Sequence, residues 1–279
     1  MRSLSFLFTP SMFNQIVKEK NVLALKRKIK NLNLNNKRIT TYQTLFKYAY
    51  SQLEESYRSE YLFKNSLINE YLLKKYSLNT TTVFNEFKIG SSIADMVLLN
   101  GTAKVFEIKT DLDGFDKLKK QVNDYIQFAD FVYVVTSEKN IEKVLNDFSN
   151  TTIGVIEFTE SNTLKERKRP VSNQRTFNHL ALFKTLRKTE YLELITEQFG
   201  YIPDVPNTMI FRECLKLSLS IKVEEFQKLV FKKLKDRKIK CPDLLASKKT
   251  PYELKQICHS LDFSEFEYLN LYQFLNKSI

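Results

Sequence analysis

Ile93-Ala94-Asp95-Met96-Val97-Leu98-Leu99 and Ala103-Lys104-Val105-Phe106-Glu107-Ile108-Lys109 are two short apolar runs that flank Asn100-Gly101. Apolar, β-branched runs on either side of Asn-Gly are typical of an antiparallel β-hairpin. Charge inside buried strands is costly unless something compensates it. Because two carboxylates and a lysine lie within these strands, the hairpin indicates a functional site.

A divalent cation would compensate the two carboxylates, and an oxygen-rich ligand set suits Mg²⁺ or Mn²⁺. Such a site needs Asp95 and Glu107 on one face of the hairpin, whereas a two-residue turn would put them on opposite faces. A three-residue turn with Gly101 left-handed places Leu98 opposite Thr102 and brings both acids and Lys109 to one face. We predict this turn, or a bulge with the same effect.

Helices are predicted on both sides of the hairpin. Residues 57–73 show helical apolar spacing, and Glu60 in this segment is the third candidate carboxylate. Residues 116–128 form the second predicted helix, in which Gln121 and Tyr125 are four apart and share a face. Further buried strands are expected at 131–135 and 153–156, with a short helix at 141–148 between them.

With these elements and residues the chain resembles the PD-(D/E)XK nuclease superfamily, and within it a little-characterised bacterial family. The order of elements from Tyr57 to Phe158 is similar to the core of that superfamily. The residues that carry the resemblance are Glu60-Tyr61, Lys64-Asn65, Asn85-Glu86-Phe87, Asp95, Glu107-Ile108-Lys109-Thr110-Asp111-Leu112-Asp113, Gln121 and Tyr125. One departure is Ala94, which stands where the motif has proline.

The resemblance implies an enzyme, a Mg²⁺-dependent phosphodiesterase that acts as a nuclease. In that case Asp95 and Glu107 hold Mg²⁺ or Mn²⁺, and Glu60 completes the metal shell. Lys109 orients or polarises the attacking water. Gln121 and Tyr125 support the lysine or contact the phosphate. A metal held by carboxylates also suits the chemistry, since it stabilises phosphoryl charge and generates hydroxide.

Each of these residues also has a plain structural interpretation. Glu107 and Lys109 would then be a charge pair on the solvated face of an edge strand, and Asp95 a lone acid of the hairpin. Glu60 would be an exposed helix residue, and Gln121 and Tyr125 ordinary helix surface and core. We interpret Glu86 as structural, and Asp111 and Asp113 as caps of the following helix.

The charge is unevenly distributed along the chain. The 279 residues contain 44 Lys and Arg against 32 Asp and Glu, a net charge of +12. Residues 1–50 carry 10 basic side chains and 1 acidic one, whereas residues 51–160 carry 12 and 17. Basic flanks around an acidic core favour a nucleic-acid partner, and DNA rather than RNA is the expected substrate of the nuclease hypothesis. The candidate phosphate-binding residues are Lys26, Arg27, Lys28, Arg167, Lys168, Arg169, Lys232 and Lys233.

Taken together, these patterns predict an α/β protein with a restriction endonuclease-like core, in which helices flank a mixed central sheet. We expect a basic helical N-terminal region at 1–50, the nuclease-like core at 51–160 and a basic helical C-terminal domain at 161–279. Helices are expected there at 180–199, 208–219 and 223–235, with Pro203 and Pro206 interrupting between the first two.

The remaining features bear on location and partners. Three unpaired cysteines and no export signal favour a reducing cytoplasm, and no segment is long enough to span a membrane. The composition suggests a bacterial or phage protein, and a role in defence, repair or mobile elements follows by analogy. The alternatives are an inactive nucleic-acid-binding or regulatory protein on the same fold, or a component directed by a protein partner. The sequence leaves open whether DNA or RNA is cut, whether cleavage is internal or at ends, any preference for sequence or structure, and whether the protein forms a homodimer.

Overall fold

The computed structural model describes residues 2–30 and 39–279, and they form two compact units. One unit contains the described residues up to 79 together with 161–164 and 239–279, and the other contains residues 80–160 and 165–238. Residues 51–79 therefore group with the chain's ends, and the helices between residues 165 and 238 group with the sheet. Within this described part of the chain, no helix is both long and apolar enough to cross a bilayer.

The first unit is helical. Its segments are η1 (Arg2–Phe8), α1 (Pro10–Phe13), η2 (Asn14–Lys18), α2 (Leu23–Lys30), α3 (Tyr42–Ser56), α4 (Glu60–Ser66), η3 (Leu67–Leu72), α5 (Leu73–Lys75), α12 (Pro242–Ala246), η5 (Tyr252–Leu254), α13 (Lys255–Leu261) and α14 (Glu265–Leu275). The helix predicted from Tyr57 begins at Glu60, because Ser59 is extended at the N-cap and the N–H of Tyr57 closes α3 on Leu53.

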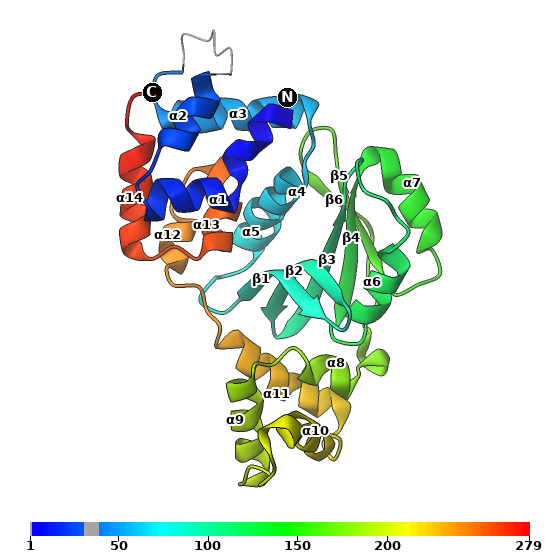
Figure 1. The fold of residues 1–279 in the computed structure, drawn as a ribbon. Helices are drawn as coiled ribbons and strands as arrows, with labels where there is room; N and C mark the ends of the chain where they lie inside the picture. The colour runs from blue at the N-terminus through cyan, green and yellow to red at the C-terminus, as the bar shows by residue number, and fades with distance from the viewer. Residues whose placement is uncertain (1, 31–38) are drawn as a thin grey trace. The chain divides into compact units, whose positions relative to one another are not determined.

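The second unit is mixed α/β, with a six-stranded sheet and flanking helices (Figure 1). Its strands are β1 (Thr82–Ile89), β2 (Ser92–Asn100), β3 (Thr102–Lys109), β4 (Phe131–Ser137), β5 (Gly154–Phe158) and β6 (Leu164–Lys168). Its helices are α6 (Leu118–Tyr125), α7 (Glu138–Asp147), η4 (Gln174–Thr176), α8 (His179–Phe183), α9 (Lys188–Phe199), α10 (Asn207–Ser218) and α11 (Val223–Lys235). The α/β prediction is confirmed at this level.

The strands lie in the sheet in their order along the chain. β1, β2 and β3 pair antiparallel, and β3, β4 and β5 pair parallel. The predicted hairpin is therefore present, and Gly101 is left-handed, with φ of +71°. The predicted pairing of Leu98 with Thr102 is wrong, because Leu98 lies opposite Lys104 and Asn100 opposite Thr102. The turn is tighter than expected, but the shift of two residues preserves the even register.

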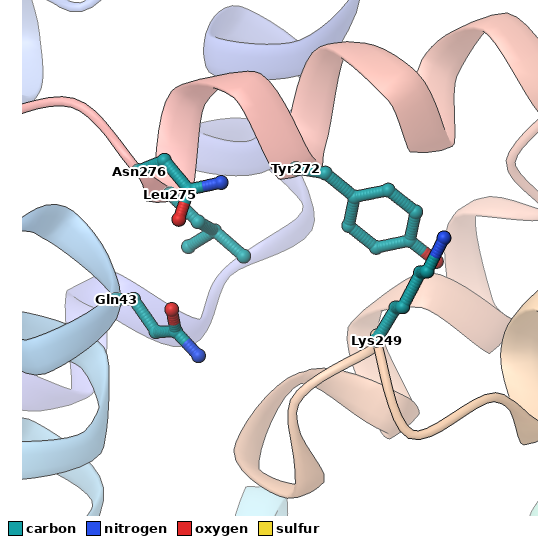
Figure 2. A pocket seen from close by; sticks show the side chains of 5 residues that line it. All are labelled: Gln43, Lys249, Tyr272, Leu275 and Asn276. Atoms are coloured by element: carbon teal, nitrogen blue, oxygen red, sulfur yellow. The ribbon is translucent and has the colours of Figure 1, made fainter.

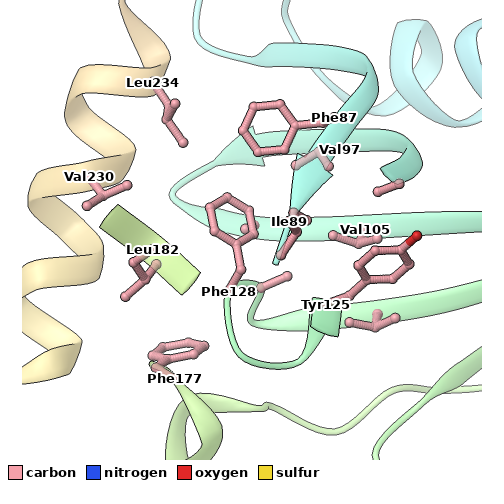
Figure 3. Packing of buried hydrophobic residues seen from close by; sticks show 14 of the residues in the cluster. Phe87, Ile89, Val97, Val105, Tyr125, Phe128, Phe177, Leu182, Val230 and Leu234 are labelled. Atoms are coloured by element: carbon pink, nitrogen blue, oxygen red, sulfur yellow. The ribbon is translucent and has the colours of Figure 1, made fainter. Parts of the chain in front are cut away.

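A large apolar core lies between one face of the sheet and the helices of this unit. It contains Val97 and Val105 from the strands, Phe128 from the segment after α6, and Val230 and Leu234 from α11 (Figure 3). The strands are apolar because these side chains are buried. The apolar sides of α8 to α11 are buried in the same core.

The helix predicted at 180–199 is instead two helices, α8 and α9. Arg187 is extended at the N-cap of α9, and its N–H donates to Glu190, three residues later. The Thr185 hydroxyl donates to the carbonyl oxygen of Leu182, which closes the end of α8. Local hydrogen bonds of this kind override an apolar spacing that continues across the break.

We expect Gly154→Ala to lower the free energy of unfolding by about 1–3 kcal/mol through overpacking. A Cβ at Gly154 would lie 2.7 Å from Cδ1 of Tyr133, whose ring is stacked on Phe106 with centroids 5.2 Å apart. Urea unfolding measures the change. The control is Gly114→Ala, since a Cβ there meets nothing closer than 3.8 Å. Equal losses in the two variants would contradict the packing argument.

Candidate metal centre

Backbone pairing between β2 and β3 stops one position short of the two hairpin acids. The last pair at this end is Met96 with Phe106, and Asp95 and Glu107 occupy the next position on each strand. Oδ2 of Asp95 accepts a hydrogen bond from the N–H of Ile108 at 2.7 Å. The Asp95 carboxylate thus satisfies a backbone donor of β3 at the point where the two strands part.

Glu107 is the most enclosed charge of the site, with only 2% of its surface exposed. Its Oε1 accepts hydrogen bonds from Nζ of Lys109, at 2.9 Å, and from Nε2 of Gln121. Nζ of Lys109 also donates to Oε1 of Gln121 at 3.0 Å. A charged pair and an amide therefore form one closed ring of contacts beneath the surface.

Tyr125 supplies the other contact to Glu107. Its hydroxyl lies 2.8 Å from Oε2 of Glu107 and 2.8 Å from the carbonyl oxygen of Ile93, and its single proton serves one acceptor at a time. Figure 3 shows its ring among apolar side chains of the core. Burial, and then the negative charge of Glu107, raise the pKa of Tyr125. Tyr125 therefore remains a protonated donor at neutral pH.

Gln121 and Tyr125 reach Glu107 together because they lie one helical turn apart on α6. The structure thus gathers five of the six residues predicted for the site: Asp95, Glu107, Lys109, Gln121 and Tyr125. Lys109 is itself 9% exposed and Asp95 is half-buried. The interpretation of Glu107 and Lys109 as a solvated surface pair does not match this burial.

Glu60, the sixth predicted residue, belongs to the helical unit. It lies at the start of α4, where Nζ of Lys64 binds its Oε1 at 2.6 Å. Its role as a third metal ligand remains a prediction, because it is carried by a different compact unit from Asp95 and Glu107.

Glu86 is the acid that the sequence interpretation passed over. By the register of β1 and β2 it lies opposite Asp95, between the pairs Asn85–Met96 and Phe87–Ala94. A carboxylate oxygen of Glu86 lies within 4.8 Å of one of Asp95. No sequence signal marks this pairing, since it depends on the β1–β2 register.

The backbone of Glu86 is left-handed, with φ of +52°, a costly conformation for a residue with a side chain. Phe84 and Phe87 would face opposite sides of a regular strand. Their rings instead lie 4.7 Å apart, and both pack on the same core. The irregularity at Glu86 therefore switches the buried face of β1 and leaves the Glu86 side chain exposed.

The donor set fits a hard divalent cation in part. Asp95 and Glu86 offer carboxylate oxygens on an accessible side, close enough to share one ion of the Mg²⁺ class after small movements. Both oxygens of Glu107, by contrast, already accept hydrogen bonds from Lys109, Gln121 and Tyr125. Oε1 of Glu107 accepts from two donors, whereas Oε2 has only the Tyr125 hydroxyl, so Oε2 is the oxygen of Glu107 that could ligate a cation.

Two of the predicted phosphate-binding lysines make internal contacts. Nζ of Lys168 donates to three backbone carbonyl oxygens, those of Phe148, Thr151 and Ile153, at 2.6 to 2.9 Å. Burial lowers its pKa. Nζ of Lys233 lies 2.6 Å from Glu197 and 3.2 Å from Glu193, so it joins α11 to α9. These ammonium groups stabilise the fold.

Of the other predicted phosphate-binding residues, two form ion pairs and four are exposed. Arg167 is paired with the buried Glu157 at 2.7 Å, and Arg169 with Glu166 at 3.3 Å. Lys232 is exposed on α11. The remaining three, Lys26, Arg27 and Lys28, are exposed on α2 of the helical unit.

A separate pocket of about 280 Å³ lies in the helical unit (Figure 2). It is lined by Gln43, Lys249, Tyr272, Leu275 and Asn276. Three of these, Gln43, Lys249 and Asn276, are exposed, and the phenol of Tyr272 is engaged by Thr250 at 2.8 Å. The pocket has no carboxylate, so it is not a second candidate for the metal centre.

Comparison with known proteins gives a family match. Residues 53–257, more than half of the chain, match the family model described as Bacteriophage P4 protein cII. Protein cII of Enterobacteria phage P4 is 28% identical over 174 residues, which cover 60% of this chain and 64% of that protein. The chain thus spans slightly less than two thirds of this relative's length.

Among solved structures, a protein of unknown function from Silicibacter pomeroyi aligns with 34% of this chain and 62% of its own. The identity is 15% and the TM-score is 0.27, a similarity too low to bear on the fold.

We expect Lys109→Met to lower the free energy of unfolding by about 3–5 kcal/mol, because it leaves the buried Glu107 carboxylate without its cation. Chemical denaturation measures the loss. Lys119→Met, an exposed lysine on α6, is the control and should change stability by less than about 0.5 kcal/mol. Adding Glu107→Gln to Lys109→Met should recover part of the loss. If the double variant loses as much free energy of unfolding as the two single variants together, the two side chains are not coupled.

Proposed function

The chain belongs to the Bacteriophage P4 protein cII family, and we propose that it is a metal-dependent nuclease that hydrolyses phosphodiester bonds in nucleic acid, in DNA rather than RNA. The observation that carries this proposal is the gathering of Asp95, Glu107 and Lys109 where β2 and β3 part. The mixed sheet, with antiparallel β1–β3 followed by parallel β4 and β5, supports assigning the core to the restriction endonuclease-like fold.

In this proposal Asp95 and Glu107 would hold Mg²⁺ or Mn²⁺, with Glu60 or Glu86 as a further ligand. When bound, the cation neutralises charge on the phosphoryl oxygens and lowers the pKa of a water molecule. Lys109 orients the attacking water with its ammonium group, which Gln121 holds in place through its amide oxygen. Tyr125 fixes the orientation of the Glu107 carboxylate.

Substrate binding in this proposal is electrostatic. Lys26, Arg27 and Lys28 are exposed on a helix that contains no acidic residue, and Lys232 is exposed on α11. Contacts of this kind bind the phosphate backbone without reading the sequence of bases. Lys168 and Lys233 serve the fold instead, as their internal contacts indicate.

The second candidate function is an inactive nucleic-acid-binding or regulatory protein that keeps the fold. One observation favours it: the oxygens of Glu107 are satisfied by protein donors alone. A closed buried network of this type stabilises a fold without any ion. Metal binding therefore discriminates between the two candidates more directly than the fold does.

The setting of the reaction is also a proposal. We place the protein in the cytoplasm of a bacterial cell, in phage, mobile-element, defence or repair biology. The phage origin of the curated relative supports the first of these settings. A homodimer, or a protein partner that directs cleavage, would add a second active site or a substrate preference.

We expect cleavage of DNA in Mg²⁺ or Mn²⁺ that falls at least ~100-fold in Glu107→Ala and in Lys109→Ala, since each variant removes a group at the reacting centre. The assay compares linear duplex, circular duplex and single-stranded DNA with RNA. Asp147→Asn, which changes an exposed acid on α7, is the matched control. If wild type cuts nothing and binds no Mn²⁺, the inactive binding protein is the better account.

The same assay identifies the third ligand. Glu60→Gln and Glu86→Gln each remove one charge, and the variant that loses the ligand should require a higher Mn²⁺ concentration for half-maximal cleavage. The other variant should follow wild type. If neither variant changes the metal requirement, the cation has no third carboxylate ligand among these two residues.

We expect the triple variant Lys26→Ala, Arg27→Ala, Lys28→Ala to bind duplex DNA with a shallower salt dependence. Each lost phosphate contact reduces the slope of log K against log salt by about 0.9. Fluorescence anisotropy between 50 and 200 mM salt, without divalent metal, gives the slope. Lys233→Ala should lower stability and leave the slope unchanged. If the triple variant keeps the wild-type slope, α2 does not contact the DNA.

A further inference from the structure

The separation of Asp95 and Glu107 is not fixed by the backbone of β2 and β3. Pairing between these strands ends at Met96 and Phe106. Residues 92–94 continue to pair, but with β1 on the other side of β2. Beyond that last pair Asp95 reaches β3 through its own carboxylate, which accepts from the N–H of Ile108 at 2.7 Å, so the distance between the start of β2 and Glu107 also depends on what holds residues 91–93.

Asp124 of α6 holds the residues that lead into β2. Its Oδ2 accepts three hydrogen bonds, from the N–H of Ser91 at 3.1 Å, the hydroxyl of Ser91 at 2.8 Å and the hydroxyl of Ser92 at 2.7 Å. Burial alone would raise the pKa of Asp124, but the hydrogen bonds from Ser92 and Ser91 outweigh it and lower the pKa. Asp124 is thus a charged acceptor at neutral pH.

The β1–β2 turn is shaped to this carboxylate. Gly90 is left-handed, with φ of +60°, and a Cβ on it would lie 3.0 Å from Cγ of Asp124. Only glycine allows both the backbone conformation and the close approach. The turn therefore packs directly against the Asp124 carboxylate.

α6 also carries the two residues that hold Glu107. Gln121 donates to Oε1 of Glu107, and the hydroxyl of Tyr125 contacts both Oε2 of Glu107 and the carbonyl oxygen of Ile93. One helix of eight residues is therefore hydrogen-bonded both to β3, through Glu107, and to the start of β2, through Ile93.

We propose that Asp124 is a positioning residue of the candidate metal centre, which clamps the β1–β2 turn to α6 and so sets the spacing of the Asp95 and Glu107 carboxylates. This inference rests on the proposed function, because it gives the spacing a role in metal binding. Asp124 does not contact the cation in this proposal. It acts through Ser91 and Ser92, as residues behind metal ligands commonly do.

The test measures Mn²⁺ affinity in the full chain without nucleic acid, by electron paramagnetic resonance of free Mn²⁺. We expect Asp124→Ala to weaken binding by ~10-fold or more. Ser91→Ala combined with Ser92→Ala should weaken it in the same direction, because this removes two of the three donors. Asn123→Ala, an exposed neighbour on α6, is the control. Circular dichroism confirms that each variant is folded at the assay temperature.

The outcomes separate this inference from the function on which it rests. If wild type binds no Mn²⁺, the metal centre and the positioning role are both wrong. If wild type binds Mn²⁺ and folded Asp124→Ala binds it equally well, only the positioning role is wrong, and Asp124 merely stabilises the turn. Where Asp124→Ala does not fold, Asp124→Asn, which keeps one acceptor oxygen, takes its place and should show an intermediate loss of affinity.

Discussion

The buried carboxylate of Glu107 is the constraint on which the arrangement of β3, α6 and the start of β2 depends. A charge that is only 2% exposed needs compensation by a cation and by hydrogen-bond donors. Lys109 supplies the charge from the same strand, and Gln121 and Tyr125 supply the donors from α6. Because these donors come from one helix, α6 must cross β3 at this point and in this rotation. The polar ring thereby orients the apolar side of α6 toward the core.

How far the sequence predicts this arrangement depends on whether each feature is local. The hairpin, the left-handed Gly101, and the pairing of Gln121 with Tyr125 on one helix face follow from turn chemistry and periodicity, which act within a few residues. The residue that pairs with Leu98 cannot be predicted in this way, because two turns that differ by two residues in register place the same side chains on the same face of the hairpin. The break between α8 and α9 is also missed, since an N-cap without Ser, Thr, Asp or Asn gives no visible signal.

Features that depend on the register between strands cannot be predicted from local sequence. Glu86 gains its place opposite Asp95 from the β1–β2 register, and its left-handed backbone has no marker in the local sequence. The charge pattern is subject to the same limit. Lys168, Lys233 and Lys255 all count toward the basic total, yet they bind carbonyl oxygens or glutamates inside the fold. A composition count therefore overstates the positive charge available to a nucleic acid.

The three acids differ in exposure, so a cation would reach them in a definite order. Glu86 is exposed, Asp95 is half-buried and Glu107 is enclosed, so a cation from solvent would meet Asp95 and Glu86 before it reached Glu107. Coordination by Oε2 of Glu107 would then use its second lone pair or, at most, replace the hydrogen bond from Tyr125, worth roughly 1 kcal/mol net, with a contact to a doubly charged ion. The enclosed network is thus compatible with metal binding. In the absence of a cation the same contacts keep the buried carboxylate satisfied, which explains how one set of residues serves both the stability of the fold and the proposed chemistry.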